Sequence, residues 1–337
     1  MAVRLQWHDD LDAVAADAGG ALDRAAQPRL YDRLDWFRMT VAHGLSGPPV
    51  VLRARDGEAS AWLFLAPAGR RHAAPLASWY TLAFAPVLAG EDAARLLPAL
   101  FREAARRFDV LTLEPVLSAD GGPLREALAT AGWRTMARIT SANRSEIVAG
   151  GFARWWLARP SRLRNTVARR RRSHPVDVAI HDRFDAEAWE AYSDVYRASW
   201  KPEEGSMPFL RELAERGGAA GTLRLGVARD SNGRAVAAQL WLVEGGTAII
   251  HKLAHREDAA AGSPGSNLSA AMFAHVIDRD AVTRLDFGLG DEPYKADWLA
   301  DVAPVWRIDA YRPFSARGAA GLGRSALGRL ARRLRAR

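Results

Sequence analysis

The clearest pattern of apolar and polar positions lies in the second half of the chain. Apolar residues crowd Ala248 to Leu253, with polar side chains at His251 and Lys252, which is typical of a central strand that carries polar groups into a cleft. The predicted elements here are a strand at 247–254, a loop at 262–266, a helix at about 266–280 and a strand at 283–287. Ser266 or Asn267 is the expected N-cap, and the free N–H groups at such a helix start can bind an anion such as a pyrophosphate.

The remaining pattern predicts the same order of elements in both halves of the chain: helices, a hairpin, a third strand, a helix and a strand. The predicted first-half helices are 11–26, 27–37, 93–108 and 123–131, and the extended segments are 50–55, 59–66, 75–88, 109–114 and 134–140. The further second-half helices are 161–172, 185–201 and 208–216, with strands at 223–229 and 235–243. We interpret this order as an internal duplication with little sequence identity. The predicted fold class is α/β (α+β), with a twisted mixed sheet flanked by helices in each half.

Length and composition favour a folded protein of two domains. The chain has 337 residues, 49% of them hydrophobic and 9% aromatic, which is ample for burial. It has no cysteine, which excludes disulfides, thiolate metal sites and a cysteine nucleophile, and no metal is expected. The N-terminal sequence lacks an apolar signal core, and no stretch approaches the ~18 apolar residues of a membrane-spanning helix. We therefore expect a cytoplasmic location.

The charge is strongly positive and comes almost entirely from arginine. The formal net charge is +8 and the isoelectric point is near 10.3, which favours anionic partners such as nucleotide phosphates, nucleic acid or a membrane surface. Eight arginines fall between Arg154 and Arg172, in a segment that also contains Trp155 and Trp156. A helix from Ser161 onward would either be a solvated connection between domains or bind an anion. The candidate anions are the phosphates of coenzyme A, a tRNA acceptor stem and lipid headgroups.

The C-terminal segment 315–337 combines leucines at helical spacing with many arginines. Such a helix fits a membrane surface with anionic lipid. A helix packed on the body of the protein and a frayed tail are the alternatives. If the segment binds membrane, the protein is expected to be peripheral on the cytoplasmic face of the inner membrane.

Several motifs together resemble one family of acyltransferases. They are Pro160-Ser161-Arg162-Leu163-Arg164-Asn165-Thr166, Tyr196-Arg197-Ala198-Ser199-Trp200-Lys201, Ala237-Ala238-Gln239-Leu240-Trp241, Lys252-Leu253-Ala254 and the segment from Asp286 to Trp298. The chain resembles the BioF-like or CelD-like branch of GNAT acyltransferases over roughly residues 25–312. This branch is related to the Fem-type peptidyltransferases, which carry tandem GNAT units. The usual GNAT phosphate signature is degenerate here, at residues 256–265.

The resemblance implies transfer of an acyl group onto an amine, from acyl-CoA or, in Fem-type relatives, from aminoacyl-tRNA. It also implies four segments: a first GNAT-like unit at 1–150, an Arg-rich linker helix at 151–175, a second GNAT unit with the active site at 176–314 and a basic tail at 315–337. Amine attack on a thioester requires a base, oxyanion stabilisation and an acid for the leaving thiolate. No covalent intermediate is needed.

The candidate site residues follow from this chemistry and from the GNAT arrangement. The catalytic candidates are His251 or Asp286 as base, Tyr294 as acid, and Lys252 and Lys295. The donor-binding candidates are the backbone at Leu253, Ala254 and His255, for the carbonyl oxygen, and the loop residues Gly262, Ser263, Pro264, Gly265, Ser266 and Asn267. The substrate-binding candidates are Gln239, Trp241, Trp200 and Asp291.

Each main candidate also has a structural interpretation. His251 would be a core or outward-facing residue, and Asp286 would cap the strand end before Gly288 or pair with Arg284. Tyr294 and Lys295 would be packing and surface residues. Lys252 and His251 are expected to face opposite sides of a regular strand. Gln239 would be hydrogen-bonded to the fold instead of to a substrate amide.

Two classes of function are therefore expected. The first is an acyl-CoA-dependent N-acyltransferase for a hydrophobic amine, with a sphingoid base as the leading acceptor, because bacterial ceramide synthases are of this GNAT-like type. The alternative is a Fem-type transferase that uses aminoacyl-tRNA, or a non-catalytic module that binds RNA or another anion. Nucleic acid is the less favoured partner, because RNA-binding arginine is commonly interleaved with lysine and this chain contains few lysines.

Overall fold

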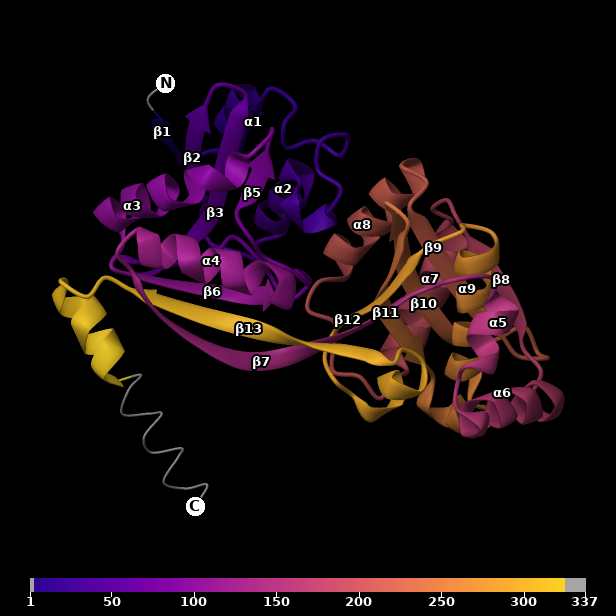
Figure 1. Cartoon of the computed structure of the whole chain (residues 1–337). Helices are drawn as coiled ribbons and strands as arrows, with labels where there is room; N and C mark the ends of the chain where they lie inside the picture. Colours follow the sequence, from indigo (N-terminus) through magenta and orange to yellow (C-terminus); the bar gives the residue numbers. More distant parts are fainter. Residues whose placement is uncertain (1–2, 325–337) are drawn as a thin grey trace, which may run out of the picture. The chain divides into compact units, whose positions relative to one another are not determined.

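The computed structural model describes residues 3–324 and divides into two compact units (Figure 1). The first unit comprises residues 1–142 and 303–337, and the second comprises residues 143–302. Two long strands, β7 (Arg134–Ile147) and β13 (Asp301–Tyr311), contribute to this division. The end of β7 pairs with β12 of the second unit, and β13 pairs with β6 of the first. The boundaries therefore differ from the predicted 150 and 314, because residues from 303 onward return to the first unit.

The first unit is a mixed sheet in the order β1-β2-β3-β4-β6-β13, with β5 paired to β3. Its other strands are β1 (Arg4–His8), β2 (Val50–Asp56), β3 (Ala59–Gly69), β4 (His72–Pro75), β5 (Val87–Ala89) and β6 (Val110–Leu117). Its helices are α1 (Leu11–Ala18), α2 (Leu34–Ala42), α3 (Leu97–Arg107) and α4 (Ser118–Thr130), with 3-10 helices η1 (Leu30–Asp32) and η2 (Ala93–Leu96). Helix α3 packs on β2 and β3 through an apolar stripe that includes Leu100, Phe101 and Ala104.

Local chemistry sets several element boundaries in this unit. The β2/β3 hairpin turns at Gly57, whose φ of 62° is in the left-handed region that glycine adopts readily, as the Asp-Gly pair predicted. The predicted helix 11–26 is wrong in its length, because Gly19 adopts φ 55° and ends α1 after Ala18. The predicted extended run 75–88 forms only the end of β4 and the start of β5.

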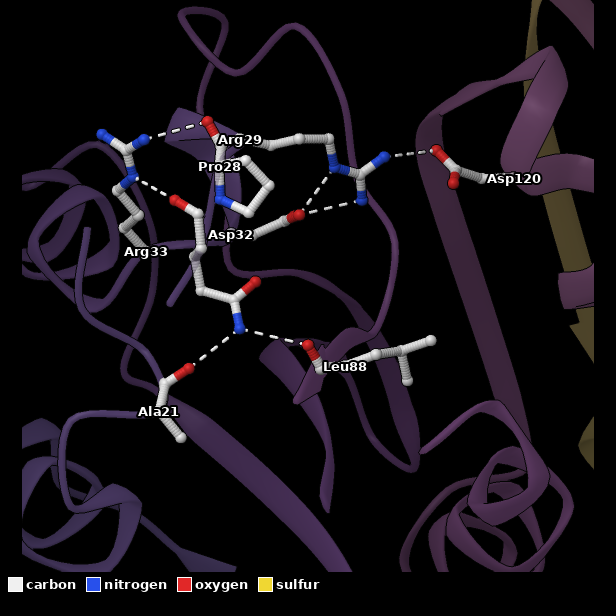
Figure 2. A network of polar contacts seen from close by, with 8 residues as sticks. Ala21, Pro28, Arg29, Asp32, Arg33, Leu88 and Asp120 are labelled. Carbon is white, nitrogen blue, oxygen red and sulfur yellow. Dashed lines mark hydrogen bonds and ion pairs between the residues drawn. The ribbon is translucent and has the colours of Figure 1, made fainter. Parts of the chain in front are cut away.

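The segment between α1 and α2 contains little regular structure and is held in place by polar contacts (Figure 2). Arg29 Nε lies 2.6 Å from Asp32 and its Nη1 lies 2.9 Å from Asp120 on α4. Gln27 Nε2 donates to the carbonyls of Ala21 and Leu88. Charge-assisted bonds of this kind are stronger than neutral ones, so the segment is held to the rest of the unit.

The second unit is a mixed sheet in the order β7-β12-β11-β10-β9-β8. Its strands are β8 (Asp177–His181), β9 (Leu223–Arg229), β10 (Ala235–Glu244), β11 (Thr247–His255), β12 (Arg284–Leu289) and the end of β7. Its helices are α5 (Phe152–Leu157), α6 (Ser161–Ser173), α7 (Ala186–Arg197), α8 (Met207–Ala219) and α9 (Pro264–Asp278), with 3-10 helices η3 (Glu257–Gly262) and η4 (Pro293–Asp297). The fold class prediction is confirmed.

Helix α9 and the helices α7 and α8 pack on this second sheet. Trp241 of β10 is fully buried against Phe273 of α9, with ring centroids 4.8 Å apart. Gly226 of β9 permits close packing, since a Cβ there would lie 2.5 Å from the sulfur of Met272. Leu242 of β10 reaches α8 near Gly217, and α7 contacts β9, β10 and β11. These contacts hold β10 and β11, which carry most of the predicted site residues.

The predicted C-terminal helix is described only in part. A helix covers residues 316–324 and packs on the first unit through Gly321, where a Cβ would lie 2.4 Å from the Tyr311 ring. Residues 325–337, with the other predicted leucines and arginines, lie outside the described residues. In the described part of the chain, none of the helices combines the length and the apolar character needed to span a membrane.

Candidate functional site

The strands β11 and β12 separate after a short parallel ladder. The ladder joins Thr247 to Arg284, Ala248 to Leu285 and Ile249 to Asp286, and these are the only paired residues of the two strands, both of which are fully described. Beyond Ile249, β11 runs on to His255 and β12 runs on to Leu289. We call the part of the sheet beyond Ile249 and Asp286, where β11 and β12 are no longer paired, the β11/β12 opening.

A β-bulge at His251 accompanies the separation. Trp241 of β10 pairs with Ile250 and Leu240 pairs with Lys252, so His251 is an extra residue on β11. A bulge bends its strand and re-aims side chains, and bulges are common beside active sites. The expectation that His251 and Lys252 face opposite sides rested on regular alternation, which the bulge interrupts.

The three lysines of the chain act on one another electrostatically. Among 47 lysine and arginine residues, only Lys201, Lys252 and Lys295 are lysines. Lys252 lies on β11 and Lys295 lies in η4, which follows β12. Lys201 follows α7, and the positive charges of both other lysines act on it. Arginine stays protonated and lysine can lose its proton, so this cluster suits chemistry that needs a titratable amine.

Two glutamates pair with two of these lysines. Glu204 Oε2 lies 2.9 Å from Lys252 Nζ, and the Glu204 side chain is only 4% exposed. Glu292 Oε2 lies 2.8 Å from Lys295 Nζ. In the described part of the chain, no acid lies within ion-pair distance of the Lys201 ammonium. Burial, and then the charge of Lys252, lower the pKa of Lys201 to about 8, against the opposing charges of Glu204 and Glu292, so this amine loses its proton at a lower pH than an ordinary lysine does.

Aromatic groups and a histidine surround the same amine. Lys201 Nζ lies 5.9 Å from the ring centroid of Trp200 and 6.0 Å from that of Tyr196. Trp200 packs on His255, with ring centroids 4.2 Å apart. Burial, and then Lys201, lower the pKa of His255, which keeps its imidazole neutral. Burial and the Glu204 carboxylate raise the pKa of Tyr196. The predicted substrate residue Trp200 thus belongs to this cluster.

Asp286 is engaged in structural contacts. Its Oδ1 accepts hydrogen bonds from Asn143 Nδ2 at 2.6 Å and from the Gly288 backbone N–H at 2.8 Å. The alternative partner Arg284 donates instead to Ser145 Oγ, at 2.8 Å. These contacts match the capping interpretation of Asp286.

The segment after β12 is fixed around Lys295. Lys295 Nζ donates to the carbonyl of Leu289 at 2.7 Å, and its side chain is 6% exposed. Gly290 has φ 103°, and a Cβ there would lie 2.7 Å from the Glu292 carboxylate. Burial, followed by Glu292, raises the pKa of Tyr294, so its phenol stays protonated. Lys295 is therefore a buried residue that shapes the loop, whereas the partly exposed Tyr294 is a protonated group beside the cluster.

Three predicted substrate residues have partners within the fold. Gln239 is buried and donates to Ser269 Oγ at 2.8 Å and to the Gly265 carbonyl at 3.2 Å. Its Oε1 accepts from Trp241 Nε1 at 2.9 Å. Gln239 and Trp241 thus join β10 to the start of α9. Asp291 accepts from Arg144 Nε at 2.7 Å.

The predicted phosphate loop leads directly into α9. The N-cap is Ser263, with φ 50°, and not Ser266 or Asn267, because the helix begins at Pro264. Pro264 has no N–H, and the Ser266 N–H already donates to the Ser263 carbonyl, so two of the first three helical positions offer no unshared donor. Asn267 is 2% exposed. Neither its side-chain Nδ2 nor its Oδ1 has a hydrogen-bond partner among the described residues.

The Arg-rich segment forms the predicted helix α6 and lies beside this loop. Leu163 and Val167 are buried, whereas Asn165 is exposed. A Cβ at Gly262 would lie 3.2 Å from the Cβ of His174, which follows α6. Two arginines of the segment have acidic partners outside it: Arg159 with Glu146, and Arg162 with Asp297. The arginines at 169, 171 and 172 are exposed.

Comparison with known proteins identifies the fold of this region. Residues 159–296 match a family described as an acetyltransferase (GNAT) domain. The matched residues lie within the second unit, residues 143–302. The match supports an acyltransferase, and no curated protein matches the sequence. The described residues contain no group of three or more His, Asp or Glu side chains that could hold a metal ion.

Solved structures with the same fold cover nearly the whole chain. One is the C-terminal domain (DUF2156) of a putative lysylphosphatidylglycerol synthetase from Agrobacterium fabrum, with 15% identity, 94% of this chain and 97% of that chain covered, and a TM-score of 0.58. Another is L-PGS from Bacillus licheniformis, with 14% identity, coverage of 87% and 95%, and a TM-score of 0.53. A third is FemX, with 10% identity, coverage of 91% and 97%, and a TM-score of 0.63. At these identities the likeness shows the fold alone.

Sequence reasoning missed four members of the cluster: Tyr196, Lys201, Glu204 and Glu292. Three of them lie in or beside segments that the motif search had already singled out. A usable signal was present in the composition, because a chain that uses arginine almost everywhere has its three lysines at one place. Glu204 lies in a segment without helical or strand periodicity, and its partner Lys252 is 48 residues away.

Proposed function

We propose that the second unit transfers an acyl group to an amine at the β11/β12 opening. The observation that carries this proposal is the coupling of Lys201, Lys252 and Lys295 across an opening that begins at a β-bulge in a GNAT domain. An amine nucleophile must lose a proton during the reaction, and a base with a pKa near the working pH accepts it most effectively. Burial lowers the pKa of Lys201 to about 8, and among the described residues its ammonium forms no direct ion pair with Glu204 or Glu292, so it meets that requirement.

The proposed reaction uses few protein groups. The acceptor nitrogen attacks the donor carbonyl carbon, whose oxygen binds backbone N–H groups of residues 253–255 on the unpaired edge of β11. The new C–N bond forms and the C–S bond of a thioester breaks. The proton of the amine passes to Lys201 directly or through water, with neutral His255 as the neighbouring alternative. The protonated phenol of Tyr294 supplies the proton for the leaving thiolate.

This assignment replaces the two bases expected from the sequence. Asp286 already accepts two hydrogen bonds that hold the start of the next loop. These contacts suit a structural role for Asp286 better than a role as catalytic base. His251 is the bulged residue, and its ring nitrogens are buried. We therefore propose His251 as the residue that opens the strand, and Lys201 as the base.

The donor is proposed to carry phosphate groups. The exposed arginines at 169, 171 and 172 lie near the end of α6, which packs along α9 next to the loop at Gly262. Long-chain acyl-CoA is the leading donor, because it supplies both phosphates and the activated carbonyl. The unpaired amide of Asn267, buried at the start of α9, would be satisfied by a polar group of the donor, which removes a cost of about 1–3 kcal/mol.

An aminoacyl-tRNA donor is the second candidate, and one observation favours it. The start of α9 offers few backbone N–H groups without a hydrogen-bond partner. The loop at 262–266 should therefore bind the pyrophosphate of coenzyme A poorly. The solved structures of the same fold include FemX, L-PGS and the C-terminal domain of a putative lysylphosphatidylglycerol synthetase. In this second candidate, the ester oxygen of the tRNA ribose replaces the thiolate as leaving group.

The acceptor is proposed to be a hydrophobic amine, with a sphingoid base as the specific candidate. This part of the proposal rests on the family resemblance and on the basic C-terminal segment, whose residues beyond 324 lie outside the described part. Association with the cytoplasmic face of a membrane belongs to the same proposal.

The direct test is an acyl transfer assay. Purified protein is incubated with palmitoyl-CoA and either sphinganine or a small polar amine, and in parallel with lysyl-tRNA and phosphatidylglycerol. Amide formed from sphinganine supports the leading candidate, and an aminoacylated product supports the second. Product from the polar amine alone would rule out the proposal that the acceptor is a lipid amine. Salt-sensitive tRNA binding without any product would favour the non-catalytic module.

A further inference from the structure

A charged cavity lies in the first unit, at strands β4, β6 and β13. Its volume is about 240 Å³, and its charged lining consists of Arg70, Arg307, Arg317, Arg324, His72 and Asp309. This volume is below the roughly 300–1,000 Å³ of pockets for drug-sized ligands. The cavity therefore suits a small, strongly anionic group.

A hydrogen-bonded chain orders one wall of the cavity. Thr112 Oγ1 donates to Asp309 Oδ1 at 2.9 Å, and it lies 3.0 Å from His72 Nε2. Because the hydroxyl has a single hydrogen, which Asp309 receives, His72 Nε2 must be the donor to Thr112. Arg307 Nε donates to the same Asp309 carboxylate at 3.0 Å, so the only acid of the lining is neutralised within the wall.

The other three arginines are not neutralised in this way. In the described part of the chain, no acid lies within ion-pair distance of Arg70, Arg317 or Arg324, whereas the nearby Arg71 and Arg312 both pair with Asp109. Three unpaired guanidinium groups around 240 Å³ repel one another. An anion in the cavity would remove that repulsion and accept bidentate hydrogen bonds.

Two of these arginines are placed by a close helix contact. Arg317, Gly321 and Arg324 are spaced four and three residues apart, which puts them on one face of the 316–324 helix. Gly321 is buried where a Cβ would lie 2.4 Å from the Tyr311 ring of β13. Only glycine permits this approach, which brings both arginines to the cavity wall.

We propose that this cavity binds a phosphate group with at least two negative charges, such as a pyrophosphate or a phosphomonoester. The site is separate from the lysine cluster, and it does not depend on the acyl transfer proposed for the second unit. The ligand could be a soluble phosphate compound or a lipid headgroup of the same chemistry, and the two sources are separated by the second experiment below.

The first experiment titrates the full chain with pyrophosphate by isothermal calorimetry at low ionic strength. The paired variant Arg317→Gln/Arg324→Gln is expected to bind at least ~10-fold more weakly, since two charge-assisted contacts are lost. Arg70→Gln removes a contact from a different element and is expected to weaken binding as well. The matched control is Arg102→Gln/Arg125→Gln, which removes two exposed arginines of α3 and α4 and should bind as the unmodified protein does.

Three results would overturn the proposal. The first is no heat of binding for the unmodified protein at millimolar pyrophosphate. The second is unchanged affinity in both cavity variants, and the third is an equal loss in the control. Circular dichroism of each variant confirms folding, and Arg70→Gln keeps the test valid if the helix variant fails to fold.

The second experiment identifies the source of the phosphate. Flotation is measured with vesicles of phosphatidylcholine, with and without phosphatidic acid, whose headgroup is a phosphomonoester. Binding to phosphatidic acid that pyrophosphate competes away, and that Arg70→Gln reduces, supports a lipid headgroup. Pyrophosphate binding without such flotation supports a soluble ligand.

Discussion

The parallel pair β11/β12 of the second unit and the parallel pair β4/β6 of the first unit differ in length, regularity and charge. Both pairs are joined through a helix, α9 in one and α3 in the other. β11 has nine residues and a bulge, and it continues well past the end of its ladder with β12. β4 has four residues and ends at Pro75, and the irregularity of its hairpin lies on the neighbouring strand β3.

The comparison indicates where each unit can do chemistry. All three lysines belong to the second unit, so the first has no titratable amine side chain. The first unit instead gathers arginines around a cavity at the start of its β4/β6 ladder. The same order of elements thus supports a cluster suited to proton transfer in one unit and a cluster suited to anion binding in the other.

Replacing the Lys201 amine should have the largest effect on activity. We expect Lys201→Arg to lower the acyl transfer rate by about 10²–10⁴-fold, the range for loss of a general base, because a guanidinium keeps its charge and cannot accept the proton. The donor affinity should change little. The rate of the unmodified protein should rise with pH through about 8, as Lys201 loses its proton, and the variant should lack this rise.

The control for this experiment is Arg211→Lys, which exchanges the same two residue types on the exposed surface of α8. It should retain the full rate and the full pH profile. An active Lys201→Arg variant with an unchanged profile would remove Lys201 from the mechanism.

Removing the bulge should convert β11 into a regular strand, as β4 of the first unit is. Deletion of His251 places Lys252 directly after Ile250, which keeps the pairing of both residues with β10. We expect a folded protein whose rate falls by about 10²-fold, because small displacements of reacting groups are costly. Steady-state kinetics and circular dichroism check this, and an unchanged rate would show that the bulge is not needed.

The fold was largely predictable where apolar patterning was strong. The strand at 223–229 and the β2/β3 hairpin match the prediction closely, since both are buried and bounded by turn residues. Strands β1, β8 and β13 were not predicted, because β1 and β8 are largely exposed edge strands and β13 contains Pro304 and several charged residues. Their pairing is decided by distant partners, which local pattern does not encode.

The candidate site was predictable only in part, for a similar reason. Lys252, Lys295 and Trp200 were selected through motifs that are local in sequence, and His255 was selected through the GNAT strand arrangement. Their electrostatic partners Glu204 and Lys201 come from an irregular segment, and only tertiary structure brings them to β11. The roles of Gln239 and Asp286 depend on hydrogen bonds to α9 and β7, which sequence reasoning left open.

The buried ion pair of the cluster should affect stability more than any pair of surface arginines. Glu204→Gln leaves Lys252 without its acidic partner at a site where the glutamate side chain is 4% exposed. We expect a loss of about 3 kcal/mol in unfolding free energy, measured by urea denaturation. The exposed pair Arg216–Glu212 provides the control, and Glu212→Gln should cost less than about 1 kcal/mol. Equal losses would show that the cluster is solvated.

Stability should also depend on pH. The folded-state pKa of Lys201 is about 8 and its ordinary value is 10.5, so between these values the unfolded chain binds more protons. The contribution of Lys201 to unfolding free energy should therefore rise with pH from about 8 to 10.5. Comparing urea denaturation of the unmodified protein and Lys201→Met across this window isolates the slope. Identical slopes for the two proteins would mean that the pKa of the Lys201 amine is not lowered in the folded state.

The most direct test of the account is a crystal structure of the protein with a non-hydrolysable long-chain acyl-CoA analogue. We predict that the analogue's carbonyl oxygen lies within hydrogen-bond distance of a backbone N–H of residues 253–255, with Lys201 Nζ on the side from which an amine would approach. An analogue bound with its carbonyl away from the β11/β12 opening, or on the far side of β11 from Lys201, would contradict the proposed site.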